Sequence, residues 1–134
     1  MVYSTVLVLE TALDPEDSPI TEPTDVARRI VDLLADRQAE EIVLLDVRHV
    51  ASFTDYFVIA TAINPRQTKA IVESLRRTLR DDGLRARHQE GALDSGWVLL
   101  DYGDVIVHIF SSEQRAFYAL EELWQEAKRV VQIQ

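Results

Sequence analysis

The sequence contains no cysteine among its 134 residues. Disulfide bonds, a thiolate nucleophile and cysteine-ligated zinc or iron–sulfur sites are therefore excluded. No apolar run reaches the roughly 18 residues that a membrane-spanning helix needs, and no basic segment precedes an apolar stretch at the N-terminus. We therefore expect neither a membrane span nor a secretory signal, and the sequence predicts a cytoplasmic protein.

Glycine and histidine are also scarce, and their spacing matches no common catalytic motif. The four glycines form neither a G-x-G-x-x-G sequence nor a phosphate-binding P-loop. The three histidines show no H-x-x-x-H or H-E-x-x-H spacing, which argues against histidine-ligated zinc. No G-x-S-x-G elbow surrounds a serine, so nothing indicates serine hydrolysis.

Positive charge is in short supply, because 14 Lys and Arg stand against 23 Asp and Glu, for a formal charge of −9. Affinity for nucleic acid comes mostly from phosphate neutralisation by Lys and Arg, so we expect no direct DNA binding. The acidity favours a basic protein partner, since long-range attraction raises the encounter rate, or it serves solubility alone. The basic side chains Lys69, Arg76, Arg77 and Arg80 either touch RNA or form a solvated helix face.

The first 23 residues differ in composition from the rest of the chain. The opening "MVYSTVLVLE" has strand preference, and the following "TALDPEDSPITEPT" holds three of the four prolines. We therefore predict an N-terminal arm or linker over residues 1–23 and one folded domain over residues 24–134.

Alternating helical and strand patterns predict a single α/β domain with a mixed sheet of about five strands flanked by helices. Thr24, Asn64 and Ser111 are predicted helix N-caps, and Gly83 is predicted to end the second helix. The last helix is predicted to be amphipathic. The expected order is α-β-β-α-β-β-β-α, over residues 24–41, 41–47, 56–62, 64–83, 84–91, the two strands of 97–110, and 111–130.

The stretch "GWVLLDYGDVIVHIF" (96–110) predicts a hairpin with Gly103 and Asp104 as its two-residue loop. This register pairs Trp97 with Phe110, Leu99 with His108 and Asp101 with Ile106. One face of the hairpin is then core, composed of Val98, Leu100, Tyr102, Val105, Val107 and Ile109. The other face mixes aromatic and polar side chains. It is either a second core layer, with His108 hydrogen-bonded to Asp101 or to backbone, or an interaction surface.

Two alternatives to a binding module remain open on the residues alone. A metal-dependent, nucleotidyltransferase-like enzyme would gather Asp46, Asp55, Asp101 and Asp104 around Mg²⁺. Asp104 lies in the predicted turn and Asp101 in the strand, so their convergence requires the turn to fold back. The other alternative is a homo-oligomeric scaffold joined through the Trp97 face. We expect no catalytic residue, no metal and no cofactor.

Several segments together resemble a known family. They are "TDYFVIATA" (54–62), "NPRQTKAI" (64–71), "EG" (90–91), "GWVLLDYGDVIVHIF" (96–110) and "RAFYALEELW" (115–124). In this order and spacing they are similar to the ribosomal silencing factor RsfS, or Iojap-like, family over about residues 24–126. The resemblance implies a nucleotidyltransferase-like fold that lacks the catalytic motif.

The resemblance also implies a function without chemistry. Such proteins bind protein fourteen of the large ribosomal subunit, block its joining with the small subunit, and so repress translation when nutrients are short. In this chain Trp97 would be the anchor, and Tyr118 and Leu123 would add apolar contact. The carboxylates expected to meet basic side chains of the partner are Asp55, Glu90, Asp101 and Asp104. A homodimer through the same surface is compatible with this function.

Overall fold

The computed structural model describes residues 22–134, so nearly all of the predicted N-terminal arm and the strand expected within it lie outside the described residues. No helix in the described part is long and apolar enough to cross a membrane. The elements of residues 22–134 are, in chain order, α2 (Pro23–Asp36), β1 (Glu40–Asp46), β2 (Tyr56–Thr61), α3 (Pro65–Asp81), β3 (His88–Glu90), β4 (Trp97–Asp101), β5 (Val105–Phe110), α4 (Ser112–Tyr118), α5 (Leu120–Leu123) and β6 (Lys128–Ile133).

A mixed six-stranded sheet organises residues 22–134, with the strand order β3-β4-β5-β2-β1-β6. The central pair β2 and β5 is parallel, and the other neighbouring pairs are antiparallel. The predicted α/β domain with a mixed sheet is confirmed, with one strand more than expected. β3 forms an edge of the sheet and is shorter than the strand predicted over residues 84–91.

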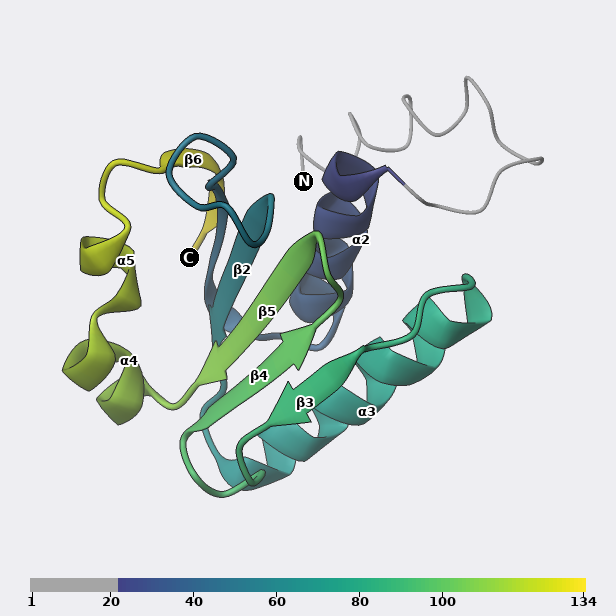
Figure 1. The fold of residues 1–134 in the computed structure, drawn as a ribbon. Coiled ribbons are helices and arrows are strands. Elements are labelled where there is room, and N and C mark those ends of the chain that lie inside the picture. Colours follow the sequence, from purple (N-terminus) through teal and green to yellow (C-terminus); the bar gives the residue numbers. More distant parts are fainter. Residues whose placement is uncertain (1–21) are drawn as a thin grey trace.

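The sheet carries a core layer on each face, and Figure 1 shows α2 and α3 on one side of it with α4 and α5 on the other. The larger core packs α2 and α3 against alternate strand residues such as Val58, Leu100 and Val107. The smaller core packs Leu120 and Trp124 against the opposite face. Burial on both faces explains why β2 and β5 are almost unbroken apolar runs.

The predicted hairpin is confirmed in its register. Trp97 pairs with Phe110, Leu99 with His108 and Asp101 with Ile106. Gly103 has a φ of 86°, a left-handed conformation that glycine adopts without steric cost. The predicted core face is also confirmed, since its members belong to the larger core or pack against it.

The helix-end predictions are confirmed in part. The side chain of Asn64 accepts a hydrogen bond from the Gln67 amide at 2.8 Å, and Ser111 caps α4 in the same way. Gly83 follows α3 with a φ of 94°, as expected of the residue after a helix. The prediction for Thr24 is wrong, because α2 begins at Pro23 and the Thr24 hydroxyl instead hydrogen-bonds the Tyr56 hydroxyl at 2.7 Å.

The single helix predicted over residues 111–130 is also wrong. Ala119 adopts a left-handed conformation with a φ of 45°, which separates α4 from the short α5. Trp124 then packs against Phe57, and the chain turns into β6, which pairs with β1. The β-branched residues Val130, Val131 and Ile133 were the sequence signal for this strand.

Candidate functional site

A layer of aromatic rings lies on the sheet face that α4 and α5 cover. Trp97 is half-buried at its centre, with its ring centroid 4.5 Å from that of Tyr118 and 4.9 Å from that of Phe110. Phe57 contacts Trp124 at 5.3 Å, and Trp124 contacts Phe53 at 6.1 Å. We call this set the aromatic layer; its members are Phe53, Phe57, Trp97, His108, Phe110, Tyr118 and Trp124.

His108 joins the two halves of the aromatic layer. Its ring lies 5.1 Å from that of Phe57 and 5.9 Å from that of Trp97. The indole Nε1 of Trp97 donates a hydrogen bond to His108 Nδ1 at 3.2 Å, so the imidazole proton is on Nε2, which is buried without a hydrogen-bond partner. Burial lowers the pKa of His108 to about 4, so the ring is neutral at physiological pH. The mixed face of the hairpin was expected to be either a second core layer or an interaction surface. His108 is buried there as part of a second core layer, and its hydrogen-bond partner is Trp97 and not Asp101.

The outer side of α4 and α5 exposes several large apolar side chains. Phe117 is 75% exposed, Leu123 is 74% exposed and Tyr118 is 44% exposed. Phe53, whose ring contacts that of Trp124, is also exposed, at 59%. Grouped apolar exposure on a small domain is typical of an interaction site. We call Phe53, Phe117, Tyr118 and Leu123 the apolar surface.

Arg115 fixes the apolar surface to the sheet. Its guanidinium group is buried and donates to both carboxylate oxygens of Glu121, at 2.9 and 3.1 Å. The Nη1 atom also donates to Thr61 Oγ1 at 2.9 Å and to the carbonyl oxygen of Glu41. One side chain of α4 thus joins α5, β2 and β1.

The predicted contact residues differ in how accessible they are. Tyr118 and Leu123 are exposed, as a contact role requires, whereas Trp97 is half-buried between Phe110 and Tyr118. Trp97 therefore supports Tyr118 from beneath more than it projects outward. The sequence patterns do not indicate Phe117 and Phe53 as contact residues; Phe117 belongs to the apolar stripe of the predicted last helix.

The predicted carboxylates lie along the hairpin and its neighbouring strands. Asp101 Oδ1 accepts a hydrogen bond from the Gly103 amide at 2.7 Å, so it also shapes the turn. The Asp55 amide donates to the carbonyl oxygen of Asp104 at 3.0 Å, which brings these two residues together. Glu90 is exposed on β3 and forms a 3.1 Å ion pair with His88.

Glu90 and Asp101 share the sheet face of Trp97. Glu90 pairs directly with Leu99, and Leu99 and Asp101 are two and four residues after Trp97 along β4. Side chains at such even spacings point to the same side of a strand. The sheet beside the apolar surface is therefore lined with carboxylates.

The aspartates of the enzymatic alternative do not form a metal site. Asp46 is bound by Arg48, whose Nη2 lies 2.7 Å from Asp46 Oδ2, and this hydrogen bond lowers the pKa of the Asp46 carboxyl. Within residues 22–134, no group of three or more His, Asp or Glu side chains is placed to hold a metal ion. Asp55 and Asp104 are left without a third ligand.

Comparison with known proteins identifies the family of this chain. Residues 20–134 match the family model described as "Ribosomal silencing factor during starvation". The chain is 35% identical over 100 residues to ribosomal silencing factor RsfS of Halalkalibacterium halodurans, covering 75% of this chain and 86% of that one. It is 36% identical over 92 residues to RsfS of Bacillus subtilis, covering 69% and 78% of the two chains.

A solved structure has the same fold. The crystal structure of a protein from Chromobacterium violaceum superposes with a TM-score of 0.75 at 30% identity, covering 78% of this chain and 88% of that one. Sequence family and fold therefore agree, and the resemblance noted from the sequence is confirmed. The chain belongs to the ribosomal silencing factor family, RsfS.

Proposed function

We propose that this protein binds protein fourteen of the large ribosomal subunit and sterically blocks joining of the small subunit. It would act in the cytoplasm and repress translation under nutrient limitation. The observation that carries the proposal is the apolar surface on a member of the ribosomal silencing factor family. Occlusion needs a stable contact and no catalytic group, and this surface offers apolar side chains that have no cover within residues 22–134.

The contact would have an apolar centre and an acidic rim. Phe117, Tyr118 and Leu123 would enter the partner, while Trp97 holds Tyr118 in place through ring contact. Central aromatic and aliphatic side chains carry most of the binding energy in such interfaces. A rim of carboxylates is expected to meet Lys and Arg of the partner, and its members are Asp55, Glu90, Asp101 and Asp104.

The charge of the chain suits a basic partner. The formal charge of −9 attracts a basic ribosomal protein from a distance, and the rim carboxylates fix its orientation. Because a hydrogen bond joins the backbones of Asp55 and Asp104, these two carboxylates would add their negative charge at neighbouring positions of the rim. Their removal should slow association and reduce its dependence on salt, with a smaller effect on dissociation.

Binding to isolated protein fourteen tests the contact. Leu123→Asp places a carboxylate in the apolar centre and should weaken binding tenfold or more by isothermal titration. Ile63→Asp is the matched control, because Ile63 is 66% exposed, lies between β2 and α3, and is not part of the apolar surface. The control should bind like the unchanged protein. Equal loss in both variants, or no binding by the unchanged protein, would refute the proposed contact.

A homodimer through the same apolar surface competes with the ribosomal contact. Two copies facing each other would bury Phe117 and Leu123, which are exposed in the single chain. Light scattering at high concentration distinguishes a monomer from a dimer. If the protein is a dimer that Leu123→Asp separates, the ribosomal partner would have to displace the second copy.

A further inference from the structure

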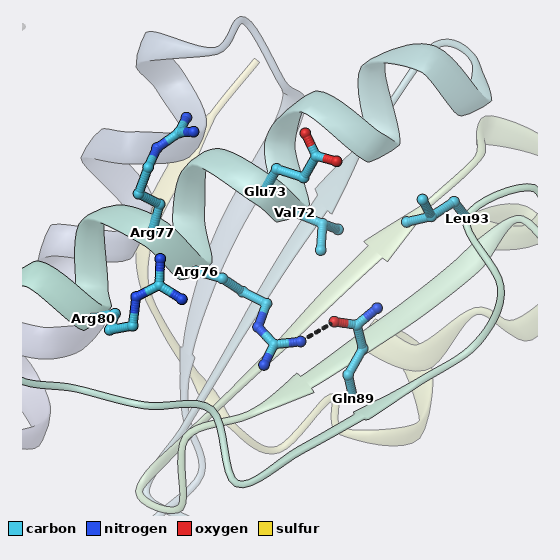
Figure 2. A pocket seen from close by; sticks show the side chains of 7 residues that line it. All are labelled: Val72, Glu73, Arg76, Arg77, Arg80, Gln89 and Leu93. Atoms are coloured by element: carbon cyan, nitrogen blue, oxygen red, sulfur yellow. Dashed lines mark hydrogen bonds between the residues drawn. The ribbon is translucent and has the colours of Figure 1, made fainter.

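A basic groove lies between α3 and β3, on the sheet face opposite the apolar surface. It has a volume of about 430 Å³ and is lined by Val72, Glu73, Arg76, Arg77, Arg80, Gln89 and Leu93. Figure 2 shows the arginines extending from α3 and Arg76 reaching toward Gln89. Val72 and Leu93 supply its apolar wall. We call this the arginine groove.

The guanidinium groups of the arginine groove are available for a ligand. Arg76, Arg77 and Arg80 are exposed. Arg76 Nη1 donates to Gln89 Oε1 at 2.6 Å, which is a neutral acceptor, and none of the three forms an ion pair within residues 22–134. Glu73 is the one acidic residue among those that line the groove. The groove is therefore locally positive although the chain as a whole is acidic.

The sheet keeps this positive groove apart from the acidic rim. Gln89 faces the groove, and its strand neighbours His88 and Glu90 point to the opposite side because side chains alternate along a strand. The ion pair of His88 with Glu90 is thus on the other face of β3. Two surfaces of opposite charge suit two different partners.

We propose that the arginine groove binds the phosphate backbone of a single RNA strand. Guanidinium groups match phosphate oxygens in geometry and stay charged, and they bind phosphate in pairs of hydrogen bonds. Arg76 and Arg80 are separated by about 6 Å along α3, since each helical residue rises about 1.5 Å. This spacing lets them contact neighbouring phosphates of one strand, with Arg77 beside them.

Features of the groove favour a strand over a free nucleotide. Its lining has no aromatic ring to stack a base and no glycine-rich loop whose amides would cradle a polyphosphate. Recognition then rests on charge along an extended backbone. The choice of RNA over DNA rests on the proposed function, which brings the protein next to ribosomal RNA.

Fluorescence anisotropy with a labelled oligouridine of about twelve nucleotides tests this site. Arg77→Gln with Arg80→Gln should weaken binding at least tenfold and lower the salt slope of log K by about 0.7 for each lost phosphate contact. The matched control is Arg66→Gln with Lys69→Gln, which removes the same charge from α3 outside the groove. This control variant should bind the oligouridine with less than a threefold loss of affinity.

Three results would overturn the proposal. They are no RNA binding by the unchanged protein, equal losses in the two double variants, and displacement of the RNA by ATP at equal phosphate concentration. The last result would reassign the groove to free nucleotides.

Titration with isolated protein fourteen separates this site from the proposed function. The Arg77→Gln, Arg80→Gln variant should bind that protein like the unchanged chain but should no longer bind RNA. If the variant loses binding to both partners, the two sites are not separate. If the unchanged protein binds RNA through the groove but not protein fourteen, the proposed function fails and the arginine groove stands.

Discussion

Replacing Arg115 by alanine should lower the free energy of unfolding by about 3 kcal/mol, the lower end of the range for breaking a buried ion pair. Arg115 is 8% exposed, and its loss leaves Glu121 and the buried Thr61 hydroxyl without their donor. The Glu121 side chain is 20% exposed and regains some hydration, which keeps the cost near that lower end. The apolar surface should lose its attachment to β1 and β2.

Urea denaturation followed by tryptophan fluorescence measures this cost. Both tryptophans, Trp97 and Trp124, lie in the aromatic layer, so their emission reports on the region that Arg115 holds. Arg115→Lys keeps the charge but cannot bind both oxygens of Glu121. Its free energy of unfolding should therefore lie between those of the unchanged protein and Arg115→Ala. Arg66→Ala, an exposed control, should change stability by less than about 0.5 kcal/mol. A loss below about 1 kcal/mol for Arg115→Ala would show that Arg115 is not the anchor.

Three further predictions concern single positions. Ala119→Gly should raise the free energy of unfolding by about 0.5 kcal/mol, because glycine adopts the left-handed conformation of Ala119 without strain. Ala116→Gly, inside α4, should lower it. Equal effects of the two substitutions in urea denaturation would contradict this prediction. Gly91→Ala should cost at least about 1 kcal/mol by the same assay, since φ is +92° and a Cβ would lie 2.1 Å from the Trp97 carbonyl oxygen. The pKa of His108 is about 4 in the folded chain and ordinarily 6.5, so stability should be full above pH 6.5 and fall by up to about 3 kcal/mol toward pH 4. His108→Phe should flatten this pH dependence, and an unchanged slope would refute it.

The hairpin and the central strands could be predicted because their signals are local. Alternation along residues 97–110 and the Gly103 turn determine the register, and apolar runs identify β1 and β2. The C-terminal region could not be predicted from its helical spacing. The left-handed conformation of Ala119 and the pairing of β6 with β1 depend on tertiary contacts, which override the local helical pattern.

The sequence predicted which kinds of side chain make up the candidate site, but not which of them are exposed. The sequence identifies Trp97 as a large aromatic on a mixed face, but only packing shows that Tyr118 and Phe110 cover it. Exposure of Phe117 depends on how α4 lies on the sheet, which no periodicity specifies. The arginine groove was predictable in part, because the sequence places Arg76, Arg77 and Arg80 on one helix, but only the packing of α3 beside β3 shows that a groove forms there.

Subunit joining is the measurement that tests the central claim most directly. Purified large and small subunits are mixed with increasing protein, and complete ribosomes are quantified by sucrose-gradient sedimentation. The proposed occlusion predicts that complete ribosomes decrease as protein saturates the large subunits, that Leu123→Asp loses this effect, and that Ile63→Asp keeps it. Unchanged formation of complete ribosomes at saturating protein would contradict the proposed function.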